Sequence, residues 1–220
     1  MRRMPKPLMN LSADDVRRDR AHTPAWWREF SQVASRTPAA ERPLRLAPAA
    51  AIKWHFTQAL AAADGAIGAH CIHELWMRRE LAVNIDAALD QLWGRAAPSI
   101  PDWLPMRDIE WLPMVYEICA QFQSQARGRT NIYLVLLDYS DSRAEPHAIY
   151  VGMSHYSAHQ RFDQHKAGIR AAGSVLRRGL EVLTGPTLHL QNIRRRDAAR
   201  IEGELAAALQ DAGLFVQGGH

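Results

Sequence analysis

The chain has 220 residues, of which 47% are hydrophobic and 23% charged, and its formal net charge is +4, a composition typical of a soluble globular protein. No apolar run approaches the roughly 18–20 residues that span a bilayer, and no apolar segment follows the basic N-terminus, so we expect neither a membrane span nor a cleaved secretory signal. Only two cysteines occur, Cys71 and Cys119, which argues against a disulfide framework and favours a cytoplasmic protein without membrane contact.

The first half of the chain has the pattern of helices. Residues 1–48 are basic and rich in proline, which predicts an arm that is partly disordered or forms short helices. Residues 49–128 are predicted to form a helical, Trp-rich region, with helices over about 48–65, 66–93 and 111–122. Residues 51–130 contain seven basic and nine acidic residues. We therefore expect this region to bind a protein partner or a second copy of the chain rather than DNA.

The sequence HCIHE lies inside the second of these helices. Its members His70, Cys71, His73 and Glu74 have the spacing of metal ligands. A closed zinc site needs four ligands, and the only further cysteine, Cys119, is distant in the sequence. Helix packing or a polar patch that faces a partner is the favoured interpretation, and zinc stays an alternative.

Residues 129–220 differ in character and are predicted to form a separate domain. Two β-rich segments flank a polar turn, which predicts an antiparallel hairpin. Apolar spacing and the positions of glycine and proline then predict the remaining elements. The elements are strands at 131–138 and 147–153, helices at 157–171 and 174–183, a strand at 187–193 and a helix at 195–212. This β-β-α-α-β-α order predicts an α+β fold with a small antiparallel three-stranded sheet flanked by helices, preceded by a mainly helical N-terminal region.

Positive charge is concentrated in this second part. Residues 161–200 contain nine lysines or arginines and three acids. A solvated helix face is the ordinary explanation of such a run, and a surface for nucleic acid is the functional one.

Five sequence features follow one another along the second part of the chain. They are NIY at 131–133, YVG at 150–152, Arg161, His165 and, in the last helix, Glu202. With this order of motifs and elements, the segment from residue 131 to the end resembles the GIY-YIG endonuclease superfamily. Asn131 stands where the family usually has glycine, and Arg161 lies nine residues after Gly152. The asparagine that often follows the glutamate is missing, and Gln217 and His220 are the candidates to replace it.

The resemblance implies a role for each side chain. Tyr133 and Tyr150, helped by His165, would position or deprotonate the attacking water. A tyrosine with an ordinary pKa near ~10 is a poor base at neutral pH, so it needs a cation nearby. Arg161 is such a cation, and its forked guanidinium can also bind a phosphate oxygen. Glu202 would hold one divalent ion, Mg²⁺ or Mn²⁺, because a single carboxylate suits an ion that keeps most of its waters.

Further residues are candidates to contact the nucleic acid. Gly152 would allow the nucleic-acid backbone to approach closely, and the other candidates would contact phosphates without reading the sequence. These others are Ser154, Lys166, Arg170, Arg194, Arg195 and Arg196. Each candidate also has an ordinary explanation as a core tyrosine, a solvent-exposed charge or an exposed helix acid.

Together these features predict a metal-dependent endonuclease that hydrolyses phosphodiester bonds, with double-stranded DNA as the favoured substrate and RNA as an open alternative. The N-terminal region would supply target binding, dimerisation or recruitment. One rival hypothesis is a catalytically weak or inactive nucleic-acid-binding module. Another is a toxin or restriction enzyme that a partner protein controls.

Overall fold

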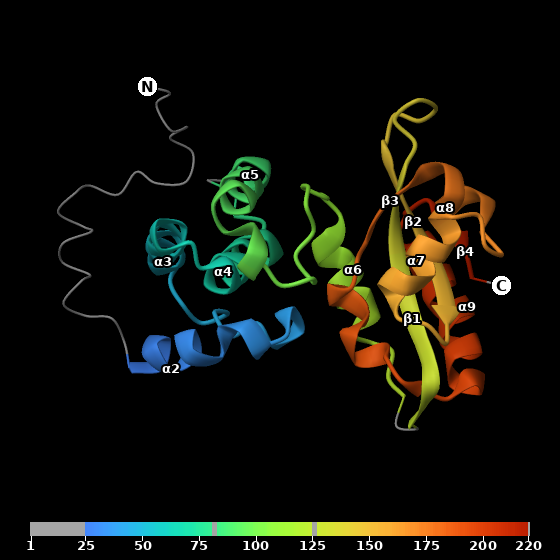
Figure 1. Cartoon of the computed structure of the whole chain (residues 1–220), viewed down its shortest axis with the longest axis horizontal. Helices are drawn as coiled ribbons and strands as arrows, with labels where there is room; N and C mark the ends of the chain where they lie inside the picture. Colours follow the sequence, from blue (N-terminus) through green and yellow to red (C-terminus); the bar gives the residue numbers. More distant parts are fainter. Residues whose placement is uncertain (1–24, 81–82, 125–126, 220) are drawn as a thin grey trace. The chain divides into compact units, whose positions relative to one another are not determined.

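The computed structural model describes residues 25–80, 83–124 and 127–219, and the chain divides between Asp108 and Ile109 into two compact units (Figure 1). The division lies N-terminal to the expected boundary near residue 128, so the helix α6, Leu112–Cys119, belongs to the second unit. Residues 1–24 of the expected N-terminal arm lie outside the described residues. Within the described ranges, no helix is long and apolar enough to cross a membrane.

The first unit is helical. Its α-helices are α2, Ala25–Val33; α3, Ala49–Ala62; α4, Gly65–Met77; and α5, Ile85–Ala96. Short 3-10 turns are η1, Ala34–Arg36; η2, Ala39–Glu41; and η3, Ala97–Ser99. The prediction of one continuous helix over 66–93 is wrong, because the chain leaves α4 after Met77 and starts α5 anew. Asn84 caps the new helix by accepting a hydrogen bond from the N–H of Ala87 at 2.9 Å.

The HCIHE residues lie on α4, which is buried along most of its length. The Glu74 carboxylate accepts hydrogen bonds from the guanidinium groups of Arg42 and Arg78, at 2.8 and 2.6 Å. The rings of His70 and His73 pack against Trp103, with centroids 4.8 and 5.7 Å apart. These are contacts of packing and ion pairing, and the described residues contain no group of three metal-ligating side chains.

The second unit is built on a four-stranded sheet in the order β3-β1-β2-β4. Strand β1, Arg127–Asp138, pairs antiparallel with β2, His147–Ser154, as the hairpin prediction required. Strand β3, Gly179–Val182, pairs antiparallel with β1, and β4, Val216–Gly218, pairs parallel with β2. The α+β class is therefore confirmed, whereas the prediction of an antiparallel three-stranded sheet is wrong because the sheet is mixed and has a fourth strand.

The third strand also lies elsewhere in the sequence than expected. Gly185–Leu190 forms the 3-10 helix η4, and Ile193 only makes isolated bridges to Arg127 and Thr130. The strand that completes the sheet on this side is β3, which directly follows the short helix α8, Gly173–Arg178. The helix predicted over 174–183 is thus half helix and half strand.

Helices cover both faces of this sheet. Alternate residues such as Tyr133, Val135 and Val182 form one core with α8 and with α7, Ala158–Lys166. The opposite face, with Ile132 and Leu134, is covered by α9, Arg195–Asp211. Figure 1 shows α7 in front of β1 and α9 partly hidden behind the sheet.

Candidate active site

The β1–β2 hairpin positions the two motif tyrosines. In its register Tyr133 lies opposite Gly152, and Val135 lies opposite Tyr150, so both tyrosines project from the same face. Their ring centroids are 6.0 Å apart. Tyr133 is buried, with 1% of its surface exposed, whereas Tyr150 is only partly buried. Tyr150 is thus the member of the pair that a solvent molecule can reach.

Gly152 is needed by the tyrosines themselves. A Cβ atom at this position would lie 2.6 Å from a ring carbon of Tyr150 and 2.7 Å from the hydroxyl oxygen of Tyr133. These distances are far inside van der Waals contact, and the neighbours are rigid rings. The sequence-based explanation, room for a nucleic-acid backbone, is therefore replaced by a packing requirement inside the protein.

We expect Gly152→Ala to destabilise the protein by about 1–3 kcal/mol, because the new methyl group must displace a packed ring. Thermal unfolding would detect this as a lower Tm. The matched control is Gly203→Ala on α9, where the nearest heavy atom to an added Cβ is 4.0 Å away. The control should gain about 0.5–1 kcal/mol, since alanine favours a helix. Equal Tm values for Gly152→Ala and wild type would contradict the packing explanation.

Helix α7 carries Arg161 and His165 one turn apart on the same face. Its first turn is fixed by a capping box, in which Ser157 and Gln160 exchange side-chain to backbone hydrogen bonds at 3.1 and 3.3 Å. His165 lies in the last turn and is 1% exposed. The cap therefore sets the start of the helix that brings both side chains to the tyrosines.

Backbone geometry fixes the direction of the hydrogen bonds around His165. The N–H of Ala172 donates to His165 Nδ1 at 2.9 Å, so the neutral ring carries its proton on Nε2. That Nε2–H donates to the Tyr133 hydroxyl at 2.9 Å. The proton of Tyr133 is then available for its hydrogen bond to Tyr150, which lowers the pKa of Tyr150. The donors run in one direction, from Ala172 through His165 and Tyr133 to Tyr150.

Burial and charge set the protonation states of these groups. Burial raises the pKa of Tyr133 and of Tyr150, and the guanidinium of Arg161 opposes this rise at both. Burial also lowers the pKa of His165 to about 4, with Arg161 contributing in the same direction. At neutral pH the imidazole is therefore uncharged and both tyrosines keep their protons.

The lowered pKa of His165 makes the stability of this unit sensitive to acid. An imidazole titrates near 6.5 in the unfolded chain and at about 4 here, so its stabilising contribution is complete above pH 6.5 and is lost as the pH falls towards 4. We expect the difference in unfolding free energy between wild type and His165→Gln to shrink by about 2–3 kcal/mol from pH 7 to pH 4. Urea-dependent hydrogen exchange of β1 measures it, and a constant difference would contradict the protonation states given above.

Arg161 is held by the segment that follows its helix. Its Nη1 donates to Gln164 Oε1 at 3.1 Å and to the carbonyl of Ile169 at 3.2 Å, and its Nη2 donates to the carbonyl of Arg170 at 2.8 Å. The same guanidinium interacts with the Tyr133 hydroxyl. Its position is thus fixed from two sides, between the tyrosines and the backbone at 169–170.

Glu202 acts on Tyr150 from the opposite layer. It lies on α9, is 7% exposed, and is close enough to raise the pKa of Tyr150. The neighbouring acid Glu204 is exposed and pairs instead with Arg200. The structure therefore brings together Tyr133, Tyr150, Arg161, His165 and Glu202, which come from four different elements.

Comparison of the chain with protein-family models, with curated proteins and with solved structures gives no match.

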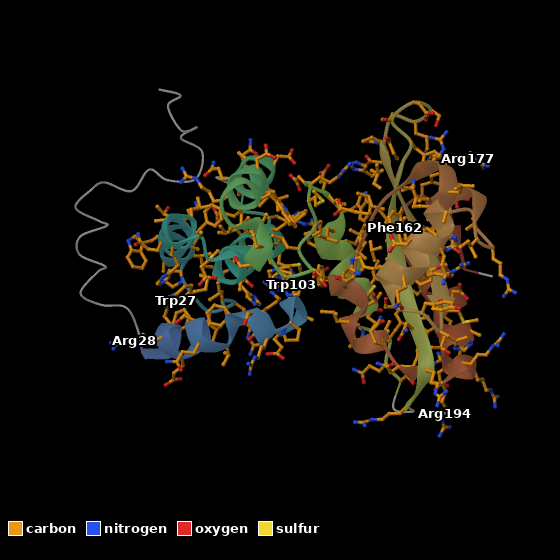
Figure 2. All side chains as sticks on the ribbon, viewed as in Figure 1. Trp27, Arg28, Trp103, Phe162, Arg177 and Arg194 are labelled. Atoms are coloured by element: carbon orange, nitrogen blue, oxygen red, sulfur yellow. The ribbon has the colours of Figure 1, made fainter. Side chains whose placement is uncertain are left out.

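The other sequence-predicted residues are more dispersed. Ser154, Arg170 and Arg195 line a pocket of about 510 Å³ that Arg161 also borders. The Nζ atom of Lys166 donates to the carbonyls of Leu176 and Gly179, which ties it to the end of α8. Arg194 and Arg196 are exposed at the start of α9. Figure 2 shows Arg194 at the end of this unit where β1 begins, away from Phe162 on α7.

The two candidate replacements for the missing asparagine have different outcomes. Gln217 lies on β4 and pairs with Tyr150 across the parallel strands, so the two side chains share a face. His220 lies outside the described residues.

Part of the site lies in residues that the sequence motifs do not include. Tyr156, Ile169 and Gln164 line the pocket beside Arg161, and Ala172 fixes the imidazole through its backbone. Tyr156 had one usable signal, an aromatic residue in the polar loop directly after β2. The backbone role of Ala172 had none, because a main-chain N–H is independent of residue type.

Proposed function

We propose that the second unit is a metal-dependent endonuclease of the GIY-YIG type that hydrolyses phosphodiester bonds, with double-stranded DNA as its substrate class. The observation that carries the proposal is the convergence of Tyr133, Tyr150, Arg161, His165 and Glu202. These residues are spread over seventy positions of the sequence and lie on both layers of the fold. Packing alone gives no reason to gather two hydroxyls, a guanidinium, a neutral imidazole and a carboxylate at one place.

The donor set fits a divalent ion such as Mg²⁺ or Mn²⁺. Glu202 would hold it, since its carboxylate is buried and close to Tyr150, and water and phosphate oxygens suit the remaining positions of such an ion. When bound, the ion supplies charge neutralisation at the phosphate and at the leaving oxygen.

The chain's own residues would orient the reactants. Tyr150, the partly buried member of the pair, would hold the attacking water, and its position is fixed by the hydrogen bonds from His165 through Tyr133. Arg161 binds a phosphate oxygen and, as a cation, makes a tyrosine proton easier to lose. Tyr133 is a positioning residue in this scheme, because it is buried and its hydroxyl already accepts from His165.

The proposal extends to partners. Arg195, which lines the pocket beside Arg161, would contact a phosphate near the site, and the exposed Arg194 and Arg196 would contact phosphates farther along the nucleic acid. The helical first unit, whose central part carries slightly more acid than base, would bind a protein partner or a second copy of the chain. We also propose that the protein is located in the cytoplasm.

Nicking of supercoiled plasmid by the full chain tests the function. We expect nicked and linear products with Mg²⁺ or Mn²⁺, none with EDTA, and none with a Glu202→Ala preparation purified in the same way, which controls for a contaminating nuclease. Parallel reactions with labelled RNA decide between DNA and RNA. The absence of cleavage with either ion on plasmid and RNA, alongside retained binding, would replace the proposal with a nucleic-acid-binding module.

A further inference from the structure

We infer that the pocket beside Arg161 holds one unstacked nucleotide, so that the preferred substrate carries an unpaired base next to the cleaved phosphate. The inference rests on the proposed function and deepens it, because it names the substrate class. The pocket has a volume of about 510 Å³, within the range of sites that bind small molecules. It lies entirely within the second unit, between the end of β2 and the turn after α7.

Two largely apolar side chains at this pocket are exposed to water, which is unfavourable, and a bound base would cover them. Tyr156 is 53% exposed and Ile169 is 55% exposed. Bases stack on aromatic side chains with little regard to sequence, because every base has a π-face. A tyrosine and an aliphatic side chain lining one pocket suit a flat, largely apolar ring.

The backbone of Tyr156 is fixed although its ring is exposed. Its N–H donates to Ser154 Oγ at 3.1 Å, and its carbonyl accepts from Asn131 Nδ2 at 2.9 Å. Asn131 also accepts at 2.8 Å, through Oδ1, from the N–H of Asn192. The asparagine that departs from the family motif therefore holds the loop that presents the aromatic ring, and the binding surface is formed before any ligand arrives.

The charges around the pocket suit a phosphate. Arg161, Arg170 and Arg195 line it, and none of the described residues that line it carries a carboxylate. Arg170 has a left-handed backbone with φ of 45°, which a non-glycine residue adopts only when its surroundings enforce it, and Arg161 supplies that restraint through the Arg170 carbonyl. Because Arg161 also interacts with Tyr133, a nucleotide in the pocket would have its phosphate beside the tyrosine pair.

Polar groups of both kinds are available for the edge of a base. His155 Nδ1 lies 3.2 Å from the carbonyl of Arg129, and since a carbonyl can only accept, Nδ1 donates and Nε2 is the ring atom left for a base. Gln164 accepts from Arg161 through Oε1, which leaves its amide N–H groups as donors. Base edges carry both donors and acceptors, so this lining suits a nucleobase better than a purely apolar ligand.

A base inside an intact duplex is stacked and paired and cannot enter such a pocket. Unstacking and unpairing are least costly where the base is mismatched or already single-stranded. The geometry therefore points to substrates with a flap, a gap or an overhang.

Binding measurements in EDTA test the inference without relying on cleavage. The full chain is titrated with a blunt DNA duplex and with the same duplex carrying a three-nucleotide flap that contains 2-aminopurine. We expect the flap to bind at least tenfold more tightly, with quenching of the 2-aminopurine fluorescence on stacking.

Variants of Tyr156 test whether its ring causes this preference. Tyr156→Ala should reduce the ratio of the two affinities to about one, and Tyr156→Phe should keep it, since phenylalanine retains the ring. Leu188→Ala, a change at an exposed apolar residue outside the pocket, is the control and should keep the preference. A matching RNA flap tells whether the sugar matters.

Equal affinity for flap and blunt duplex, or a preference that Tyr156→Ala leaves intact in a folded protein, would overturn the inference. Magnesium-dependent cleavage combined with equal affinities for flap and blunt duplex would rule out the nucleotide pocket and support the nuclease function. A flap preference that depends on Tyr156, with no cleavage in the presence of any ion, would rule out the nuclease function and support the nucleotide pocket.

Discussion

Replacing Glu202 with glutamine is expected to lower metal-dependent nicking by at least about 10³-fold, with little change in the stability of the fold. Glutamine has nearly the same shape and keeps an oxygen, but it lacks the charge that would hold a divalent ion beside the phosphate. Loss of one preorganised electrostatic group in an enclosed site costs about 10²–10³-fold in rate, and loss of the ion adds to this. Initial rates on supercoiled plasmid over a range of Mn²⁺ concentrations measure the effect.

Glu204→Gln is the matched control for this experiment. Glu204 lies two residues further along α9, where a helix turns by about 200°, and it is exposed and paired with Arg200. The control should nick DNA within about twofold of wild type, since an exposed ion pair contributes little. Equal losses in the two variants would mean that Glu202 has no special place in the reaction.

Arg161→Ala is expected to reduce nicking by about 10²–10³-fold, and Arg161→Lys to recover only part of that loss. The guanidinium has two tasks: it would bind a phosphate oxygen and it lowers the pKa of both tyrosines. Lysine keeps the charge but cannot bond Gln164, Ile169 and Arg170 at the same time. Rates at saturating and at limiting DNA separate the effect on chemistry from the effect on binding.

Arg143→Ala controls for the loss of one positive charge. Arg143 lies in the turn between β1 and β2 and stacks on Phe215, with its guanidinium carbon 4.0 Å from the ring centroid. It should leave the nicking rate unchanged at moderate salt. If Arg143→Ala and Arg161→Ala were equally slow, general attraction of DNA would explain Arg161, and its place beside the tyrosines would have no consequence for catalysis.

The hairpin could be predicted because its signals are local. Alternating β-branched and aromatic residues on either side of a polar turn determine which residues pair, and the pairing decides that Tyr133 and Tyr150 share a face. The helix spacing of Arg161 and His165 is equally local. These were enough to place most of the candidate site from the sequence.

The sheet could not be completed in this way because its outer strands depend on contacts distant in the sequence. Residues 187–193 alternate like a strand, yet Gly185 and Pro186 start a 3-10 helix there. The four residues of β3 and the three of β4 are too short to give a periodic signal, and they become strands only beside β1 and β2. Their pairing is a property of the tertiary structure.

Several roles within the site were equally hidden from the sequence. The sequence suggests that Gly152 leaves room for a ligand, whereas in the structure the missing side chain leaves room for two tyrosine rings. The sequence suggests that Lys166 contacts a phosphate, whereas in the structure it donates hydrogen bonds to backbone carbonyls at the end of α8. In both cases the residue type was informative, but the identity of the neighbour could come only from three-dimensional packing.

The position of Arg161 between the pocket and the tyrosines links the binding of anions to the binding of protons. Its charge lowers the pKa of Tyr150, so an anion that neutralises this charge shifts Tyr150 towards its protonated form. Thermodynamic reciprocity then requires that ionisation of Tyr150 weaken the anion by the same factor. A single side chain thereby makes anion affinity fall in alkaline solution, where the hydroxyl loses its proton.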